Sequence, residues 1–123
     1  MRLNLDFDKT RHLIRAYREG CITINEQDIH QSLIVTPDRL ITDWPPQHFA
    51  QLHENHFQII EQLQPEIVLL GTGKCHRFPQ PRLTSRLLRR RIGVEVMSTA
   101  GACRTYNIVV AEGRRVVAAL LIT

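Results

Sequence analysis

No stretch of this sequence is long and apolar enough to cross a membrane as a helix. A transmembrane helix needs roughly 20 consecutive apolar residues, and every apolar run here is far shorter. The opening residues MRLNLDFDKTRHL also lack the apolar segment of a secretory signal. Because Asp6 and Asp8 do not suit an acid-poor mitochondrial presequence, we expect a cytoplasmic protein without a transmembrane segment.

Cysteine is scarce, and its spacing does not indicate a metal site. The three cysteines, Cys21, Cys75 and Cys103, are scattered along the chain, and no CxxC pair occurs. Reduced thiols in a cytoplasmic protein are the simplest interpretation. We expect no bound metal and no cofactor.

The remaining composition is that of an ordinary soluble globular protein, with 43% hydrophobic and 23% charged residues. A chain of 123 residues predicts one domain, 1–123, that buries a real core without disulfides. The sequence pattern changes after Trp44. Residues 1–44 are strand-rich, and residues 45–123 follow the order helix–β–α–β–α–β.

Short segments rich in β-branched and aromatic residues predict strands in the first part, with polar turns between them. These segments are 13–20, 21–25, 30–37 and 39–44. Their short connections favour an antiparallel meander.

The second part predicts a parallel or mixed sheet with helices on its faces. The apolar run over 66–71 is typical of a strand covered on both faces. Further strands are predicted over 94–98 and 115–122.

Three helices are predicted around these strands, over 45–64, 83–92 and 99–112. The apolar face of the first contains Phe49, Leu52, Ile59, Ile60 and Leu63. The second turns Leu83, Leu87 and Leu88 inward, and Gly93 is placed to end it. The third is capped by Ser98 or Thr99, is closed by Gly113, and has the inner stripe Ala102, Cys103, Tyr106, Val109 and Val110.

The segment GTGK, residues 71–74, resembles a phosphate-binding loop only in part. The loop of nucleoside triphosphatases is GxxxxGK followed by Ser or Thr, whereas here the glycines lie too close together and Cys75 follows Lys74. A dinucleotide-binding loop needs a third glycine where His76 stands. We interpret the two glycines as permitting a tight strand exit, at the end of the sheet where ligand crevices form.

His53 and His56 are three residues apart, which places them on neighbouring positions of the predicted helix. Zinc needs at least a third ligand, and the HExxH pattern is absent. A histidine pair with local hydrogen bonds is therefore favoured over a metal site.

Polar and reactive side chains near the strand ends define a candidate pocket. Glu95 interrupts a strand that we expect to be buried on both faces, where an unpaired carboxylate is costly. The start of a helix lowers a thiol pKa, but the place of Cys103 on the inner stripe favours packing, and Cys75 is expected to be more exposed. The candidate pocket comprises Gly71, Thr72, Gly73, Glu95, Thr99, Cys103, Tyr106 and Asn107. It suits either a polar network that fixes the loop or a small-ligand site, and no residue is assigned a catalytic role.

Arginines concentrate in RLTSRLLRRR, residues 82–91, although the formal net charge of the whole chain is only +4. The run is either a solvated face or a basic partner surface formed by Arg86, Arg89, Arg90 and Arg91. Nucleic acid is the weaker interpretation, because no aromatic platform or recognisable binding motif accompanies these residues.

The segments LLGTGKCHRFPQP and GVEVMSTAGACRTYNIVVAEGRRVVAALL together resemble a small family of domains of unknown function that includes the mitochondrial complex I assembly factor 3. The chain looks like a prokaryotic member, with Ser98 where an Asp is common and Gly101 where a larger residue is common. The resemblance implies a three-layer α/β fold with a mixed central sheet, helices and an additional N-terminal β-meander layer. It also implies no established activity or cofactor for prokaryotic members, and a mitochondrial relative that binds a partner assembly factor and membrane-associated subunits.

Our leading hypothesis is therefore a non-enzymatic protein-binding chain, a monomer or weak homodimer, that helps a respiratory or other complex to assemble. The alternative is a small-ligand-binding module or enzyme whose site is the candidate pocket. Nucleic-acid binding through the arginine run is a third possibility.

Overall fold

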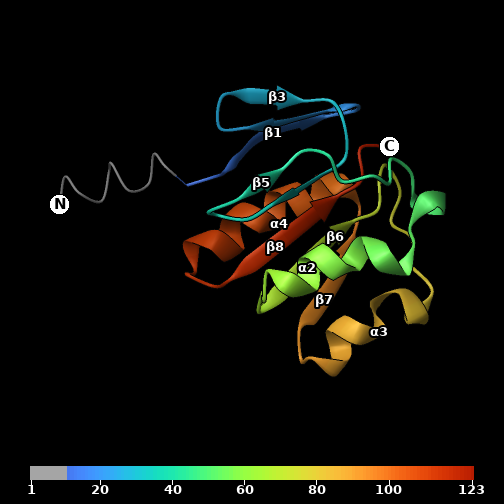
Figure 1. Cartoon of the computed structure of the whole chain (residues 1–123). Helices are drawn as coiled ribbons and strands as arrows, with labels where there is room; N and C mark the ends of the chain where they lie inside the picture. The colour runs from blue at the N-terminus through green and yellow to red at the C-terminus, as the bar shows by residue number, and fades with distance from the viewer. Residues whose placement is uncertain (1–10) are drawn as a thin grey trace.

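The computed structural model describes residues 11–123 and contains two β-sheets (Figure 1). The strands are β1 (Ile14–Arg18), β2 (Cys21–Ile24), β3 (Gln27–Ile29), β4 (Leu33–Val35), β5 (Leu40–Ile41), β6 (Ile67–Gly71), β7 (Gly93–Met97) and β8 (Val116–Leu120). The helices are the 3₁₀ turns η1 (Phe49–Gln51) and η2 (Glu54–Phe57) and the α-helices α2 (Gln58–Gln62), α3 (Pro81–Arg89) and α4 (Thr99–Ala111). The first ten residues of the predicted strand-rich part lie outside the described residues.

The larger sheet is mixed and has the strand order β5–β4–β8–β6–β7. β6 runs parallel to both β7 and β8, whereas β4 is antiparallel to β8 and to β5. The smaller sheet is the antiparallel meander β1–β2–β3. The predicted α/β fold with an N-terminal meander layer is therefore confirmed.

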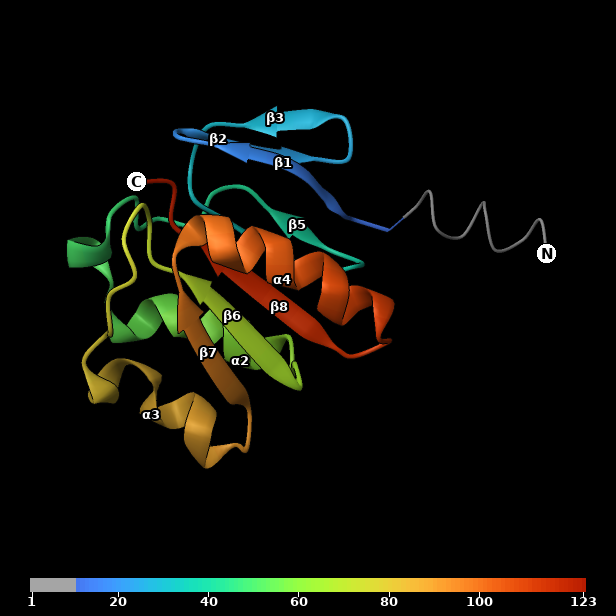
Figure 2. The same cartoon turned by 180° about the vertical axis from the view of Figure 1, so that it is seen from behind.

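Helices cover the two faces of the larger sheet differently (Figures 1 and 2). α4 and the meander pack over one face, while α2 and α3 pack over the other. Alternate residues of β6 supply both cores: Leu69 packs towards α4, and Val68 and Leu70 pack towards α2 and α3. All five residues of β6 are buried, as its continuous apolar sequence predicted.

The sequence signals at both ends of α4 are confirmed. The Ser98 hydroxyl accepts a hydrogen bond from the Gly101 N–H at 3.1 Å and so caps the helix. After the helix, Gly113 has a φ of +78°, the left-handed conformation that glycine adopts without strain. Every residue of the predicted inner stripe of α4 is buried: Ala102, Cys103, Tyr106, Val109 and Val110.

The N-terminal strands divide between the two sheets. β4 and β5, predicted as part of the meander, instead join the central sheet through the pairing of β4 with β8. The meander has its own third strand, β3, in a segment that the sequence pattern had suggested was a turn. The turn itself is shorter, because Asn25 adopts a φ of +54° and lets the chain reverse at once.

The prediction of one continuous helix over 45–64 is wrong, because this segment is broken into η1, η2 and the five-residue α2. Side chains compete with the helical backbone here: the Gln47 carboxamide donates to the Trp44 carbonyl at 3.2 Å and to the Pro45 carbonyl at 3.1 Å. The Trp44 indole N–H donates to the His56 carbonyl at 3.0 Å. The apolar face nevertheless packs inward, because Phe49, Leu52, Ile59, Ile60 and Leu63 all contact the core under α2 and α3.

Two details around α3 also differ from prediction. Leu88 points outward and is 56% exposed, while Leu87 is buried. The left-handed residue after the helix is Arg91, with a φ of +63°, and Gly93 instead begins β7. β7 is the outermost strand of the sheet rather than a strand buried on both faces, and Glu95 on it is therefore exposed.

Candidate functional site

The carboxyl ends of β6 and β8 are closed by hydrogen bonds to Thr99. Its hydroxyl donates to the Leu121 carbonyl at 2.7 Å and accepts the Gly73 N–H at 2.8 Å. A Cβ on Gly71 would lie 2.9 Å from the Thr99 Cα, and one on Gly73 would lie 2.5 Å from the Thr123 carbonyl oxygen. The two glycines thus permit close approach of backbones, and the chain's own C-terminal residues occupy the space at this strand exit.

Thr72 holds the loop that follows. Its hydroxyl oxygen lies 2.7 Å from the Cys75 carbonyl and accepts the Arg77 N–H at 3.1 Å. The loop therefore has a defined path and presents its side chains, from Lys74 to Phe78, to solvent. Phe78 is 79% exposed, with its ring centroid 4.6 Å from that of His76.

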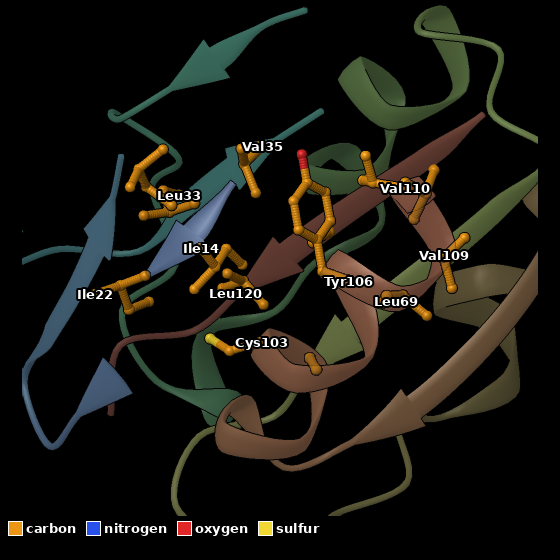
Figure 3. Close-up of a cluster of buried hydrophobic side chains, with 14 of the residues drawn as sticks. Ile14, Ile22, Leu33, Val35, Leu69, Cys103, Tyr106, Val109, Val110 and Leu120 are labelled. Atoms are coloured by element: carbon orange, nitrogen blue, oxygen red, sulfur yellow. The ribbon is translucent and has the colours of Figure 1, made fainter. Parts of the chain in front are cut away.

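Cys103 and Tyr106 lie in the core between α4, the meander and the central sheet (Figure 3). Burial raises the pKa of the Cys103 thiol to about 12, so this sulfur stays protonated near neutral pH and is not a ready nucleophile. Burial also raises the pKa of Tyr106, whose hydroxyl donates to the His12 carbonyl at 2.7 Å. Both side chains are packed in this core.

Asn107 joins α4 to the first strand of the meander. Its carboxamide oxygen accepts the Ile14 N–H at 3.0 Å, and its carboxamide N–H donates to the Ile14 carbonyl at 2.7 Å. The Asn107 side chain thus forms hydrogen bonds to both backbone groups of one residue at the edge of β1, as a neighbouring strand would.

The residues of the candidate pocket therefore lie in different places. Gly71, Thr72, Gly73 and Thr99 meet at the strand exit, Cys103 and Tyr106 lie in the core, and Asn107 holds β1. Glu95 lies on the exposed outer strand, in register with Leu69 of β6.

The histidines form local hydrogen bonds, as predicted. His56 Nδ1 accepts the N–H of His53 at 3.0 Å, and the His53 ring lies 2.9 Å from the Asn55 side-chain oxygen. Burial, followed by the neighbouring His53, lowers the pKa of His56. Among residues 11–123, no three His, Cys, Asp or Glu side chains gather as a metal site would require.

α3 lies on the side of the central sheet opposite α4 (Figure 2). The arginines of α3 and of the turn after it are exposed and form a basic surface there. We call this set, together with the exposed Leu88, the α3 surface; its arginines are Arg82, Arg86, Arg89, Arg90 and Arg91. Arg89 and Arg91 take part in no ion pair within residues 11–123.

Glu61 of α2 lies beneath the α3 surface and is paired twice. Its carboxylate oxygens lie 3.1 Å from a terminal guanidinium nitrogen of Arg86 and 2.6 Å from Nε of Arg90. The Glu61 side chain is only 10% exposed, although it does not belong to the apolar face that the sequence predicted for this segment. Its position follows from the packing of α3 beside α2, and nothing in the sequence near Glu61 indicated that pairing.

The geometry defines a mixed α/β fold whose strand exit is filled by its own backbone and whose α3 helix carries a basic surface. The chain belongs to the family described as "Protein of unknown function (DUF498/DUF598)", which matches residues 14–121. The family resemblance found in the sequence is thereby confirmed. Among residues 11–123, none of the helices combines the length and apolar character needed to cross a membrane.

Known relatives span animals and bacteria. The chain is 34% identical over 110 residues to "NADH dehydrogenase [ubiquinone] 1 alpha subcomplex assembly factor 3" of Homo sapiens, covering 88% of this chain and 59% of that protein. It thus spans about three fifths of the length of the curated animal relatives that it matches. A solved structure from Xanthomonas campestris is 39% identical with a TM-score of 0.82, over 90% of this chain and 84% of that one. A crystal structure from Bordetella parapertussis is 37% identical with a TM-score of 0.86, over 91% and 96% of the two chains.

Proposed function

We propose that this chain binds an acidic protein partner through the α3 surface and assists the assembly of a respiratory or other protein complex. The observation that carries the proposal is the exposure of Arg89, Arg91 and Leu88 beside each other, with neither arginine in an ion pair among the described residues. Arginine is enriched in protein interfaces, and an apolar side chain among charges adds area to bury.

The names of the relatives suggest complex assembly as the process in which this chain takes part. The Homo sapiens relative is called an assembly factor of NADH dehydrogenase, and it is 34% identical to this chain over 110 residues. Assembly factors act by binding other proteins, so a docking surface is the feature that such a role requires. We carry the role over as a proposal, because the chain matches 59% of that relative.

Charge complementarity favours an acidic partner. Three of the five arginines of the α3 surface pair with two acidic side chains of the neighbouring segment, Glu54 and Glu61, which leaves an excess of positive charge among the described residues. The excess positive charge speeds encounter with an acidic surface and disfavours a basic one, with an effect that weakens as salt rises.

Co-purification with paired charge reversals tests the proposal. The chain is recovered at native expression level as wild type, as R89E/R91E and as the matched control R15E/R104E. The control changes the charge equally, but on β1 and α4. Arg86 and Arg90 are left intact, because they neutralise the nearly buried Glu61.

We expect one defined acidic partner whose affinity falls at least about tenfold with R89E/R91E and stays near wild type with R15E/R104E. Deletion of the gene should reduce the abundance of the complex to which that partner belongs. Equal loss with both variants, or recovery of no partner together with unaltered complexes, contradicts the proposal. Binding that nuclease treatment abolishes would assign the surface to nucleic acid and refute protein docking.

A further inference from the structure

A hollow of about 310 Å³ lies between β1 and α4, on the side of the central sheet opposite the α3 surface. Its lining residues are Ile14, Arg15, Ala16, Tyr17, Ala100, Cys103, Arg104 and Asn107. The lining residues from α4 are spaced three and four apart and so lie on one face of that helix. The hollow therefore lies between this face of α4 and β1.

The lining is rich in hydrogen-bond donors and has no carboxylate. Arg15 and Arg104 are both exposed, and neither belongs to an ion pair within the described part of the chain. Burial is the main cause that raises the pKa of Tyr17, with smaller contributions from Cys103 and Glu19, so its phenol keeps its proton near neutral pH. Two guanidinium groups and a phenol therefore face the hollow without an acidic partner there.

The backbone of β1 is irregular where Arg15 lies. The pairing of β1 with β2 shifts between Ile14 and Ala16, which leaves Arg15 as the extra residue of a β-bulge. Bulges redirect side chains and are common beside binding sites. Asn107 fixes the bulged strand against α4 by its two hydrogen bonds to Ile14, so the backbone of Arg15 is held beside the α4 face that carries Arg104.

The rest of the lining is apolar. Ile14, Ala16 and Ala100 contribute aliphatic surface, and the buried Cys103 contributes a protonated thiol. A bare inorganic anion would leave this surface uncovered, whereas an organic anion would cover it. The volume is at the lower end of the range of small-molecule sites.

We propose that this hollow binds a small organic carboxylate with a short apolar body, its carboxylate held by Arg15 and Arg104. Guanidinium and carboxylate groups form charge-assisted hydrogen bonds, which are stronger than those between neutral groups. This function is separate from protein docking through α3 and does not depend on it.

A two-dimensional ¹H–¹⁵N NMR titration tests the proposal, with 4-phenylbutyrate as the probe. Its neutral counterpart, 4-phenyl-1-butanol, and inorganic phosphate are titrated in parallel. We expect saturable shifts confined to amides around Arg15, Tyr17, Ala100 and Arg104 with 4-phenylbutyrate, and much weaker binding of the other two. R15Q/R104Q should weaken binding about tenfold or more, while the exposed control R89Q should leave it unchanged.

Several outcomes would overturn the site. These are equal binding of the alcohol, binding of phosphate as tight as that of the carboxylate, an equal loss with R89Q, or no saturable shift at these amides. The single variants R15Q and R104Q replace the double variant if it does not fold, and each should weaken binding at least about threefold. R89Q changes the α3 surface and leaves the hollow unaltered. Absence of carboxylate binding in the hollow would therefore leave the docking proposal intact, and absence of docking would leave the carboxylate proposal intact.

Discussion

Replacing Asn107 by alanine should destabilise the fold by detaching β1 from α4. The side chain forms hydrogen bonds of 3.0 Å and 2.7 Å to the N–H and C=O of Ile14, a residue only 5% exposed. Each buried backbone group left without a partner costs about 1–3 kcal/mol, with the lower values applying where water can enter from the adjacent hollow. Water can enter from the hollow, so each of the two groups should cost about 1–2 kcal/mol. Alanine recovers about 0.5 kcal/mol through its higher helix propensity, so the net loss should be about 1.5–3.5 kcal/mol.

Urea unfolding followed by circular dichroism measures this loss, and hydrogen exchange at the Ile14 amide locates it. The neighbouring Ile108, which is 60% exposed, provides a matched control on the same helix. Ile108→Ala should change the free energy of unfolding by less than about 0.5 kcal/mol. A comparably small change in Asn107→Ala, with unaltered exchange at Ile14, would refute the role that we assign to this side chain.

Three further predictions follow from the packing and the pKa shifts. Cys75 is exposed and should react with a maleimide at neutral pH, whereas Cys103 should not. Mass spectrometry of the labelled native protein measures this difference. Equal labelling would contradict the burial that raises the pKa of Cys103 to about 12. Gly73→Ala should cost about 2 kcal/mol or more in the free energy of unfolding, because its φ is +95° and its Cβ would lie 2.5 Å from the Thr123 oxygen. Gly20→Ala, at a φ of +81° with no atom within 4 Å, should cost only about 1 kcal/mol, and equal costs would exclude the contact as the cause. The folded state holds the pKa of His56 below its unfolded value of 6.5, so the free energy of unfolding should fall as pH drops through that value. His56→Gln should flatten this pH dependence in urea unfolding. An unchanged pH profile in the variant would contradict the contribution assigned to His56.

The elements that the sequence predicted well are those with strong local signals. β6 is a continuous apolar run between polar residues, and α4 combines a capping Ser98, an apolar stripe and a terminal Gly113. Each signal acts within a few residues, so tertiary context had little to override.

The errors arise where long-range contacts decide the outcome. Strand order places β8 between β4 and β6 and leaves β7 outermost, so Glu95 is exposed although its segment resembles a buried strand. Local periodicity cannot report that order. The segment over 45–64 kept its apolar face but lost helical continuity, because side chains such as Gln47 bond its backbone groups.

The same distinction applies to the candidate site. The tight strand exit was predictable from the spacing of Gly71 and Gly73. The hollow between β1 and α4 was not, because Arg15 and Arg104 are far apart in sequence and come to line the same hollow only in the fold, beside a bulge that no local pattern indicated. Glu61 was likewise recognisable only after α3 had been placed beside α2.

Photo-crosslinking in living cells tests the central claim, docking through α3, most directly. A photoreactive amino acid is placed at Arg89 in one strain and at Arg15 in another, both at native expression level. We predict a single protein adduct from position 89 and none from position 15, with the position-89 adduct diminished by Arg91→Glu. Adducts of equal yield at both positions, or an adduct at position 15 alone, would contradict docking through the α3 surface.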